Sequence, residues 1–273
     1  MRFNKLSTFF VLVVTCFLFS CSKDPITGKT TYNWFGIEKD PQFGEEVLTG
    51  QLTELRKKGA KIDEQADPAM TRKIREMTKR IAAVSHYPNF PFEAHYADVD
   101  IVNAWCAPGG KVMVYSGLFD PKKGLVDKNN ENELAAVLGH EIAHATARHV
   151  TKAMSRNMTI MAVGQVAVSA IGASGSGLAQ DAFNQAIVSG INLYIPAYSR
   201  SNEAEADRIG IMYAAKAGYN PQAAVDLWYR ACQKKGNNAD LYASHPSNCD
   251  RAKNLQTLLP QAMEAYRTSS FRN

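Results

Sequence analysis

The chain has 273 residues, 45% of them hydrophobic, which is enough to bury one sizeable core after a targeting segment is removed. Its net charge of +5 is mild, and the sequence contains no block of like charges that would indicate a nucleic-acid partner. Composition therefore favours a single globular domain, which we place at 41–273, and argues against nucleic-acid binding.

Residues 1–20 have the pattern of a secretory signal peptide, with Arg2 and Lys5 ahead of an uncharged apolar run. That run is too short to span a membrane as a helix. The four residues that end at Cys21 resemble a bacterial lipobox, in which the cysteine becomes the lipidated first residue of the mature protein. More than one acyl chain there would give stable membrane attachment. We expect a lipidated Cys21 and a tether over 21–40; the alternative is a secreted soluble protein.

Two helices are predicted to begin after Asp40 and Asp67, because each of these caps is followed by proline at the first helical position. Three short extended runs follow, at 92–96, 101–106 and 111–115. Pro108-Gly109-Gly110 forms the turn between the last two runs, so the pattern predicts a small antiparallel sheet.

An exposed edge of this sheet could accept a substrate backbone as an added strand, through main-chain hydrogen bonds that do not depend on substrate sequence. The candidate residues for this substrate strand are Asn103, Ala104 and Trp105. An ordinary structural hairpin is the alternative.

Residues 158–173 are apolar and rich in small side chains, and a Gly-Ser stretch follows them. The run is short for a membrane span and has Gln165 near its middle. We expect 158–195 to form a mobile helical lid, with a buried core helix as the alternative. Further helices are predicted from Ser199 or Ser201, from Asn220 and from Ser247. The expected fold class is α+β, mainly helical.

A helix is also predicted from Asn130, whose side chain is a suitable N-cap and is followed three residues later by Glu133, as in a capping box. This helix carries His140-Glu141-Ile142-Ala143-His144, an H-E-x-x-H arrangement. Residues at i and i+4 share one helix face, so both imidazoles can bind one Zn²⁺ while Glu141 acts on a water molecule. The motif predicts zinc peptidase chemistry.

A catalytic zinc needs three protein ligands and an open fourth position. Metzincins place the third histidine six positions after the second, where Val150 stands; His149 misses that position by one and is expected at the surface or behind a ligand. A later helix offers Glu203 and Asp207 at i and i+4, so one carboxylate can bind zinc while the other accepts the N–H of a ligating histidine. Glu205 is a rival ligand by composition but should face elsewhere.

These motifs together resemble the HtpX and Oma-type zinc metallopeptidases, and most of all their periplasmic lipoprotein members such as LoiP and BepA. The residues that carry the resemblance are Asn103-Ala104, Pro108-Gly109-Gly110, the run from Glu133 to His144, and Glu203-Ala204-Glu205-Ala206-Asp207. The resemblance spans about 40–265. It implies a zincin-like domain with its small sheet beside the H-E-x-x-H helix, and one Zn²⁺ per chain held by His140, His144 and Glu203, with Asp207 supporting a ligand.

The resemblance also matches Ser244-His245-Pro246 and Arg251 to late family positions. His245 could stabilise the oxyanion of the tetrahedral intermediate, or it could occupy the fourth zinc position in a resting state. Replacement of His245 by alanine would lower turnover in the first case and raise basal turnover in the second. A structural histidine that caps the last helix is the third possibility.

Three cysteines, Cys106, Cys232 and Cys249, follow the expected lipidation site. An exported compartment permits a disulfide, and Cys232 with Cys249 is the pair we expect because a turn separates two helical stretches there. The alternative is three unpaired buried thiols. Cys106 has no visible base beside it, so a covalent acyl-enzyme is not expected.

By resemblance, the function is that of a membrane-anchored zinc endopeptidase that hydrolyses unfolded or misassembled cell-envelope proteins, on the periplasmic side of the outer membrane. Glu141 would be the general base. The alternative is a chaperone-like or binding lipoprotein on the same scaffold, with a closed, mostly inactive metal site. Steady hydrolysis of an unfolded protein, abolished by Glu141→Gln with zinc still bound, would separate the two.

Overall fold

The computed structural model describes residues 21–24, 26–28, 30–170, 198–235, 245 and 249–272. The expected signal peptide and residues 171–195 of the expected lid lie outside the described residues. The chain divides into two compact units, one formed by Met1–Asp40 with Val150–Asn192 and the other by Pro41–His149 with Leu193–Asn273. In the described part of the chain, no helix combines the length and the apolar character that a membrane crossing requires.

The first unit contains a hairpin of β1 (Cys21–Lys23) and β2 (Thr30–Tyr32), a 3-10 turn (Ile37–Lys39), and α5 (His149–Ala170) from Val150 onward. Polar contacts join the hairpin to the helix. The buried Asp24 carboxylate accepts a hydrogen bond from Lys152, at 2.5 Å, and the Asn33 amide donates to the Thr151 hydroxyl, at 3.0 Å. The segment that was expected to be a tether thus contains local structure of its own.

The second unit is mainly helical, which confirms the predicted α+β class. Its helices are α2 (Asp40–Lys57), α3 (Pro68–Ala82), α4 (Glu131–Thr146), α7 (Arg200–Lys216), α8 (Gln222–Lys235) and α9 (Cys249–Arg267). Short 3-10 turns lie at Asp63–Gln65, Pro108–Gly110 and Ser116–Phe119. The start of α3 is as predicted, because the Asp67 side chain accepts hydrogen bonds from two backbone amides of the first turn. α9 continues through Pro260.

The sheet of this unit has three strands, β3 (Glu93–Ala97), β4 (Ala104–Ala107) and β5 (Lys111–Tyr115), in the order β3-β5-β4. β4 and β5 form the predicted antiparallel hairpin, with Gly109 and Gly110 of the turn at positive φ. β3 pairs with the opposite edge of β5 and runs parallel to it. The prediction of a purely antiparallel sheet is therefore wrong; the sheet is mixed.

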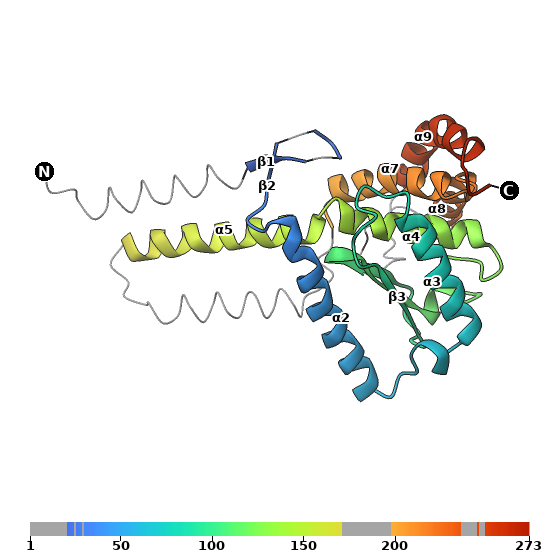
Figure 1. The fold of residues 1–273 in the computed structure, drawn as a ribbon, viewed down its shortest axis with the longest axis horizontal. Helices are drawn as coiled ribbons and strands as arrows, with labels where there is room; N and C mark the ends of the chain where they lie inside the picture. The colour runs from blue at the N-terminus through green and yellow to red at the C-terminus, as the bar shows by residue number, and fades with distance from the viewer. Residues whose placement is uncertain are drawn as a thin grey trace, which may run out of the picture. The chain divides into compact units, whose positions relative to one another are not determined.

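The most extensive contact between two helices of this unit, among the described residues, is between α4 and α7, which lie side by side in Figure 1. Two glycines face each other where these helices meet. A Cβ atom on Gly210 would lie 2.7 Å from the His140 Cα atom, and one on Gly139 would lie 2.6 Å from the Gly210 carbonyl oxygen. The absence of side chains at both positions permits a backbone approach that brings residues of α7 against the H-E-x-x-H turn of α4.

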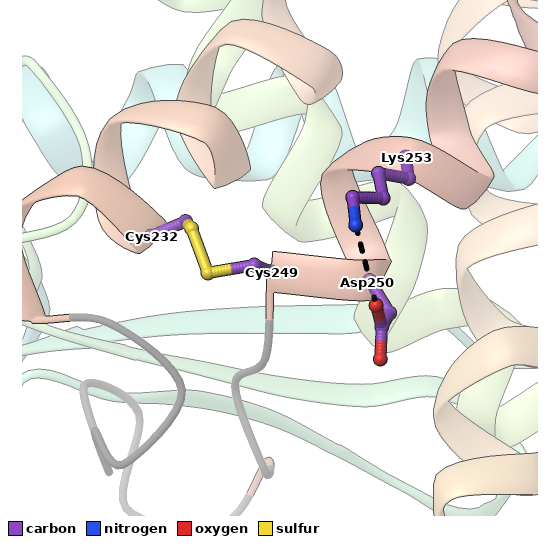
Figure 2. Close-up of a disulfide and its surroundings, with 4 residues drawn as sticks. All are labelled: Cys232, Cys249, Asp250 and Lys253. Atoms are coloured by element: carbon purple, nitrogen blue, oxygen red, sulfur yellow. Dashed lines mark ion pairs between the residues drawn. A yellow bond between two sulfur atoms is a disulfide. The ribbon is translucent and has the colours of Figure 1, made fainter.

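A disulfide links the end of α8 to the start of α9. Figure 2 shows the bond between Cys232 and Cys249, whose Cα atoms are 5.0 Å apart. The predicted pairing is confirmed, and Cys106, which is buried, is the free cysteine among the described residues. The two cysteines are 17 positions apart in the sequence, and His245 lies between them.

A buried histidine on β3 lies between two carboxylates. His95 Nδ1 is 2.7 Å from Asp63 Oδ2, and its Nε2 is 3.0 Å from Glu93 Oε1. Burial alone would lower the pKa of His95, but the hydrogen bonds and charges of Asp63 and Glu93 outweigh burial and raise that pKa above its ordinary value. The arrangement favours the protonated imidazole.

Candidate metal centre

The helix that carries the H-E-x-x-H motif begins where the sequence predicted. The Asn130 side chain accepts hydrogen bonds from the backbone amides of Asn132 and Glu133, so it caps α4. The Glu133 carboxylate is buried, accepts from the Asp127 backbone N–H at 2.9 Å, and forms a pair with the Arg230 guanidinium at 2.7 and 2.9 Å. These contacts fix the helix start against α8 and hold the motif two turns further on.

Four buried side chains bring one potential ligand atom each to a common point, with all of these atoms within 4.8 Å of one another. They are His140 and His144 of α4, Glu203 of α7, and His245. The two α4 imidazoles have Nε2 atoms 3.0 Å apart, and His144 Nε2 is 3.3 Å from Glu203 Oε1. The structure thus brings together the three predicted ligands and adds His245 to them.

The spacing of this cluster fits a small tetrahedral cation. Zinc bonds of about 2.0–2.1 Å at tetrahedral angles place two ligand atoms about 3.3 Å apart. The His140 Nε2 atom is 3.2 Å from His245 Nδ1 and 3.4 Å from Glu203 Oε2. Lone pairs of imidazole nitrogens that face each other this closely repel unless a proton or a cation lies between them. Two or three imidazole nitrogens with one carboxylate oxygen are the donor set that zinc favours.

The second nitrogen of His140 is held by a carboxylate. Its Nδ1 atom is 2.9 Å from Asp207 Oδ1, so Nδ1–H donates there and Nε2 is left to face the cluster. The Arg251 guanidinium in turn binds Asp207 through two hydrogen bonds, at 2.6 and 2.8 Å, and lies 2.9 Å from Glu203. Arg251 also stacks over the Trp228 ring, with 3.6 Å from its Cζ atom to the ring centroid.

The charges in and around the cluster favour the addition of one positive charge. Burial and the Arg251 charge both lower the pKa of His140, but the charge of Glu203 and the bond to Asp207 outweigh them and raise it to about 9. Burial raises the pKa of Glu203, yet the charges of His140 and Arg251 hold it far below its usual range. Burial lowers the pKa of His144, which keeps that imidazole neutral, as a metal ligand must be.

Comparison with known proteins identifies the family. Residues 68–259, which run from α3 to α9 and contain every residue of the cluster, match the profile of Peptidase family M48. The chain belongs to this family. It is 32% identical over 237 residues to the mitochondrial metalloendopeptidase OMA1 of Arabidopsis thaliana, an alignment that covers 85% of this chain and 45% of the relative.

Two further relatives have related names. The mitochondrial metalloendopeptidase OMA1 of Schizosaccharomyces pombe is 30% identical, with 90% of this chain and 68% of the relative covered. The beta-barrel assembly-enhancing protease of Yersinia pestis is 34% identical, with 58% of this chain and 32% of the relative covered. The chain thus spans 32% to 68% of the length of these three relatives. The expected resemblance to this metallopeptidase family is confirmed.

Glu141 of this M48 chain is 1% exposed and contacts His245, a residue of the cluster. The His245 Nε2 atom is 3.4 Å from Glu141 Oε1, while its Nδ1 atom is 2.8 Å from Glu203 Oε1. His245 therefore lies between the two glutamates, with one nitrogen toward each. Both the oxyanion role and the fourth-ligand role that were considered for His245 require it to lie at this cluster, where the structure places it.

Tyr198 is a residue of the site that sequence reasoning missed. Its ring stacks on the His144 ring, with centroids 3.8 Å apart and an interplanar angle of 26°. Burial, and then the nearby charge of Glu141, raise the pKa of the Tyr198 hydroxyl well above its ordinary value, so it stays protonated. A lone tyrosine ahead of a helix cap gives no sequence signal; only the fold brings it over the imidazole.

The predicted substrate strand lies at the edge of the sheet. Ala104 and Trp105 begin β4, which pairs with β5 on one side only among the described strands, and Asn103 precedes it. All three side chains are buried, so what this strand can offer a substrate is its backbone. β4 also packs against α4.

Cys106, the next residue on β4, is buried and has an unpaired thiol. Burial raises the pKa of its thiol well above the ordinary value, and the charge of Glu141 raises it further. The thiol therefore stays protonated, and a protonated thiol is a poor nucleophile.

Proposed function

We propose that this M48 protein is a zinc-dependent endopeptidase that hydrolyses peptide bonds of unfolded or misassembled proteins of the cell envelope. The observation that carries the proposal is the buried convergence of His140, His144 and Glu203 beside Glu141. When bound by these three residues, Zn²⁺ supplies Lewis acidity that lowers the pKa of water toward neutrality and polarises a scissile carbonyl.

Glu141 is the proposed general base. It lies on the same turn of α4 as the two histidines, so its carboxylate is fixed relative to the ligand atoms by the helix itself. It would take a proton from the attacking water and return it to the leaving amine. Asp207 and Arg251 keep the His140 ring in the orientation that exposes Nε2 to the site.

The β4 edge is the proposed binding surface for the substrate backbone, over Asn103, Ala104 and Trp105. An extended peptide that adds to this edge would be held by main-chain hydrogen bonds, which do not select for substrate sequence. Only a segment without secondary structure of its own can present its backbone in this way. The edge therefore supports unfolded or misassembled chains as substrates.

His245 is proposed to close the site in its resting form. Its Nδ1 atom lies 3.2 Å from His140 Nε2 and 2.8 Å from Glu203 Oε1, at the place of a fourth ligand. Four protein ligands are typical of structural zinc sites, whereas a catalytic site keeps one position open. Displacement of His245 would open that position and would also release its contact with Glu141. The position of His245 against His140 and Glu203 is the observation that supports the second candidate function, a chaperone-like or binding protein with a mostly inactive site.

The proposed location is the periplasmic side of the outer membrane, through acyl chains on Cys21. The signal-peptide pattern of residues 1–20 and the lipobox that ends at Cys21 support it. The name of the Yersinia relative, beta-barrel assembly-enhancing protease, fits an envelope protein, whereas two other relatives are named as mitochondrial.

The test is hydrolysis of an unfolded protein such as casein by the wild type, by His245→Ala and by His245→Ala combined with Glu141→Gln. Glu141→Gln removes the base without removing a ligand, so it should abolish hydrolysis while zinc content stays unchanged. Glu264→Gln, at an exposed position of α9, is the control for a glutamate lost elsewhere. Zinc-loaded protein that hydrolyses nothing even with His245 removed would refute the peptidase and leave the second candidate.

A further inference from the structure

His149 lies behind His144 and contacts it directly. Its side chain is buried, and its Nδ1 atom is 2.8 Å from His144 Nδ1. On the other side of the ring, His149 Nε2 is 3.0 Å from Glu205 Oε2. Glu205 is a residue of α7, and a quarter of its side chain is exposed. His144, His149 and Glu205 therefore form a series of contacts that begins at the metal cluster and ends near the surface.

When a metal is bound to His144, only one arrangement of the hydrogen atoms on these two imidazoles satisfies all of the contacts. His144 presents Nε2 to the cluster, where it lies 3.0 Å from His140 Nε2. A neutral imidazole that binds a metal through Nε2 carries its hydrogen on Nδ1, so His144 Nδ1–H donates to His149 Nδ1. His149 then carries its own hydrogen on Nε2 and donates it to the Glu205 carboxylate.

The backbone is bent at the point that places His149 there. α4 ends at Thr146, and Arg148 has a φ of 58°, in the left-handed region that residues with a side chain rarely adopt. In an uninterrupted helix, residue 149 would be about 140° around the axis from residue 144 and could not contact it. The turn at Arg148 brings the His149 ring back toward the His144 ring, at a centroid distance of 4.8 Å.

The two α4 histidines are thus supported by parallel arrangements. His140 donates directly to Asp207, a contact already expected from the spacing of the acidic helix. His144 reaches its carboxylate, Glu205, through an intervening imidazole. Both carboxylates lie on α7, which also carries Glu203, so one helix supplies a ligand and both supports.

We propose that His149 and Glu205 are positioning residues, which hold His144 in the tautomer and ring orientation that direct its Nε2 atom at the metal. The inference rests on the proposed zinc site. It assigns no contact with substrate to either residue. Its consequence is measurable in metal binding itself, since loss of such a supporting hydrogen bond commonly weakens metal affinity by about 10- to 100-fold.

The experiment measures zinc affinity by competition with a chelator, and the visible spectrum of the Co²⁺-substituted protein, for His149→Leu, His149→Asn and Glu205→Ala. His149→Leu and Glu205→Ala should weaken zinc binding by about 10- to 100-fold and change the Co²⁺ spectrum. His149→Asn retains a hydrogen-bond acceptor near the position of Nδ1, so it should bind zinc more tightly than His149→Leu. Glu264→Ala, on α9, is the control and should bind zinc as the wild type does.

Unchanged zinc affinity in His149→Leu and Glu205→Ala would overturn the inference, as would equal losses in the asparagine and leucine variants, which indicate packing alone. Glu205 is partly exposed, so Glu205→Ala decides the matter if His149→Leu does not fold. A Glu203→Ala variant measured in parallel separates the two proposals. Full zinc binding by that variant would refute the ligand set. A loss there with no effect of His149→Leu and Glu205→Ala would refute only the positioning role of His149 and Glu205.

Discussion

Substitution of Gly210 by alanine should separate the two helices that supply the metal ligands. A Cβ atom there would lie 2.7 Å from the His140 Cα atom and from its backbone nitrogen. These are backbone atoms, so no side-chain rotation can relieve the contact. Ordinary van der Waals contact begins at 3.4 Å, which means that α4 and α7 must move apart by about 0.7 Å, the difference between 3.4 and 2.7 Å.

Two opposing effects decide the size of the stability change. Alanine is a better helix former than glycine by about 1 kcal/mol, which favours the variant. Overpacking of a tight interface costs about 1–3 kcal/mol, and contact with backbone belongs at the upper end of that range. We therefore expect the free energy of unfolding to fall by about 1–2 kcal/mol. Metal binding should suffer more, because ligand distances tolerate only about 0.2 Å, less than the required displacement.

The assay combines denaturant unfolding of the metal-free protein with zinc titration against a chelator. Gly50→Ala is the matched control, since Gly50 lies in α2 and a Cβ atom there would have nothing within 4 Å. That variant should gain about 1 kcal/mol from helix propensity and bind zinc normally. If Gly210→Ala is stabilised to the same extent and binds zinc as tightly as the wild type, the close helix approach is not what aligns the ligands.

Three further predictions concern His245, the Cys232–Cys249 disulfide and the buried His95 of β3. His245→Ala should raise basal casein hydrolysis by about tenfold or more, because without this imidazole the closed form of the site is no longer populated. Lower turnover would instead favour the oxyanion role of His245. Reduction of Cys232–Cys249 should lower the free energy of unfolding by about 3 kcal/mol, seen as a lower denaturant midpoint. The pKa of His95 is raised in the folded protein, so its contribution to stability is present at acid pH and is lost as pH rises above about 6.5 through the folded pKa. Unfolding measured against pH should show this fall in the wild type and not in His95→Gln.

Local patterns predicted the metal helix well because every relevant interaction is close in sequence. The Asn130 cap and the i, i+4 spacing of His140 and His144 are properties of one helix, and the structure reproduces them. A capping box would also place the Glu133 side chain on the backbone N–H of Asn130, and the structure gives Glu133 other partners. Glu133 accepts from the Asp127 backbone and pairs with Arg230, a partner 97 positions away that a local pattern cannot identify.

The sequence pattern could not predict the direction in which β3 runs. A strand with one solvent-exposed face alternates apolar and polar residues, but the residues of β5 and β4 are buried throughout and those of β3 almost so. Such strands do not reveal which neighbour they pair with. The turn at Gly109 and Gly110 fixed the β4–β5 hairpin, and β3 was then free to pair with the other edge of β5 in the parallel direction.

His149 and Tyr198 show the same limit at the site. His149 was predicted to lie at the surface or behind a ligand, and the turn at Arg148 determines that it lies behind His144. Glu205 was predicted to face away from the metal, and it faces His149. Neither contact follows from spacing, because each depends on a helix end and on the packing of α7 against α4.

The most direct test of the account is the zinc content per chain of the purified wild type and of Glu203→Ala, measured by elemental analysis after removal of loosely bound metal. The proposed ligand set predicts about one zinc per chain in the wild type and a loss or strong weakening in the variant, because the cluster would lose its one negatively charged ligand. Among the described residues, it would keep the imidazoles of His140, His144 and His245. Full zinc content in Glu203→Ala would contradict the proposed centre and with it the mechanism built on α4 and α7.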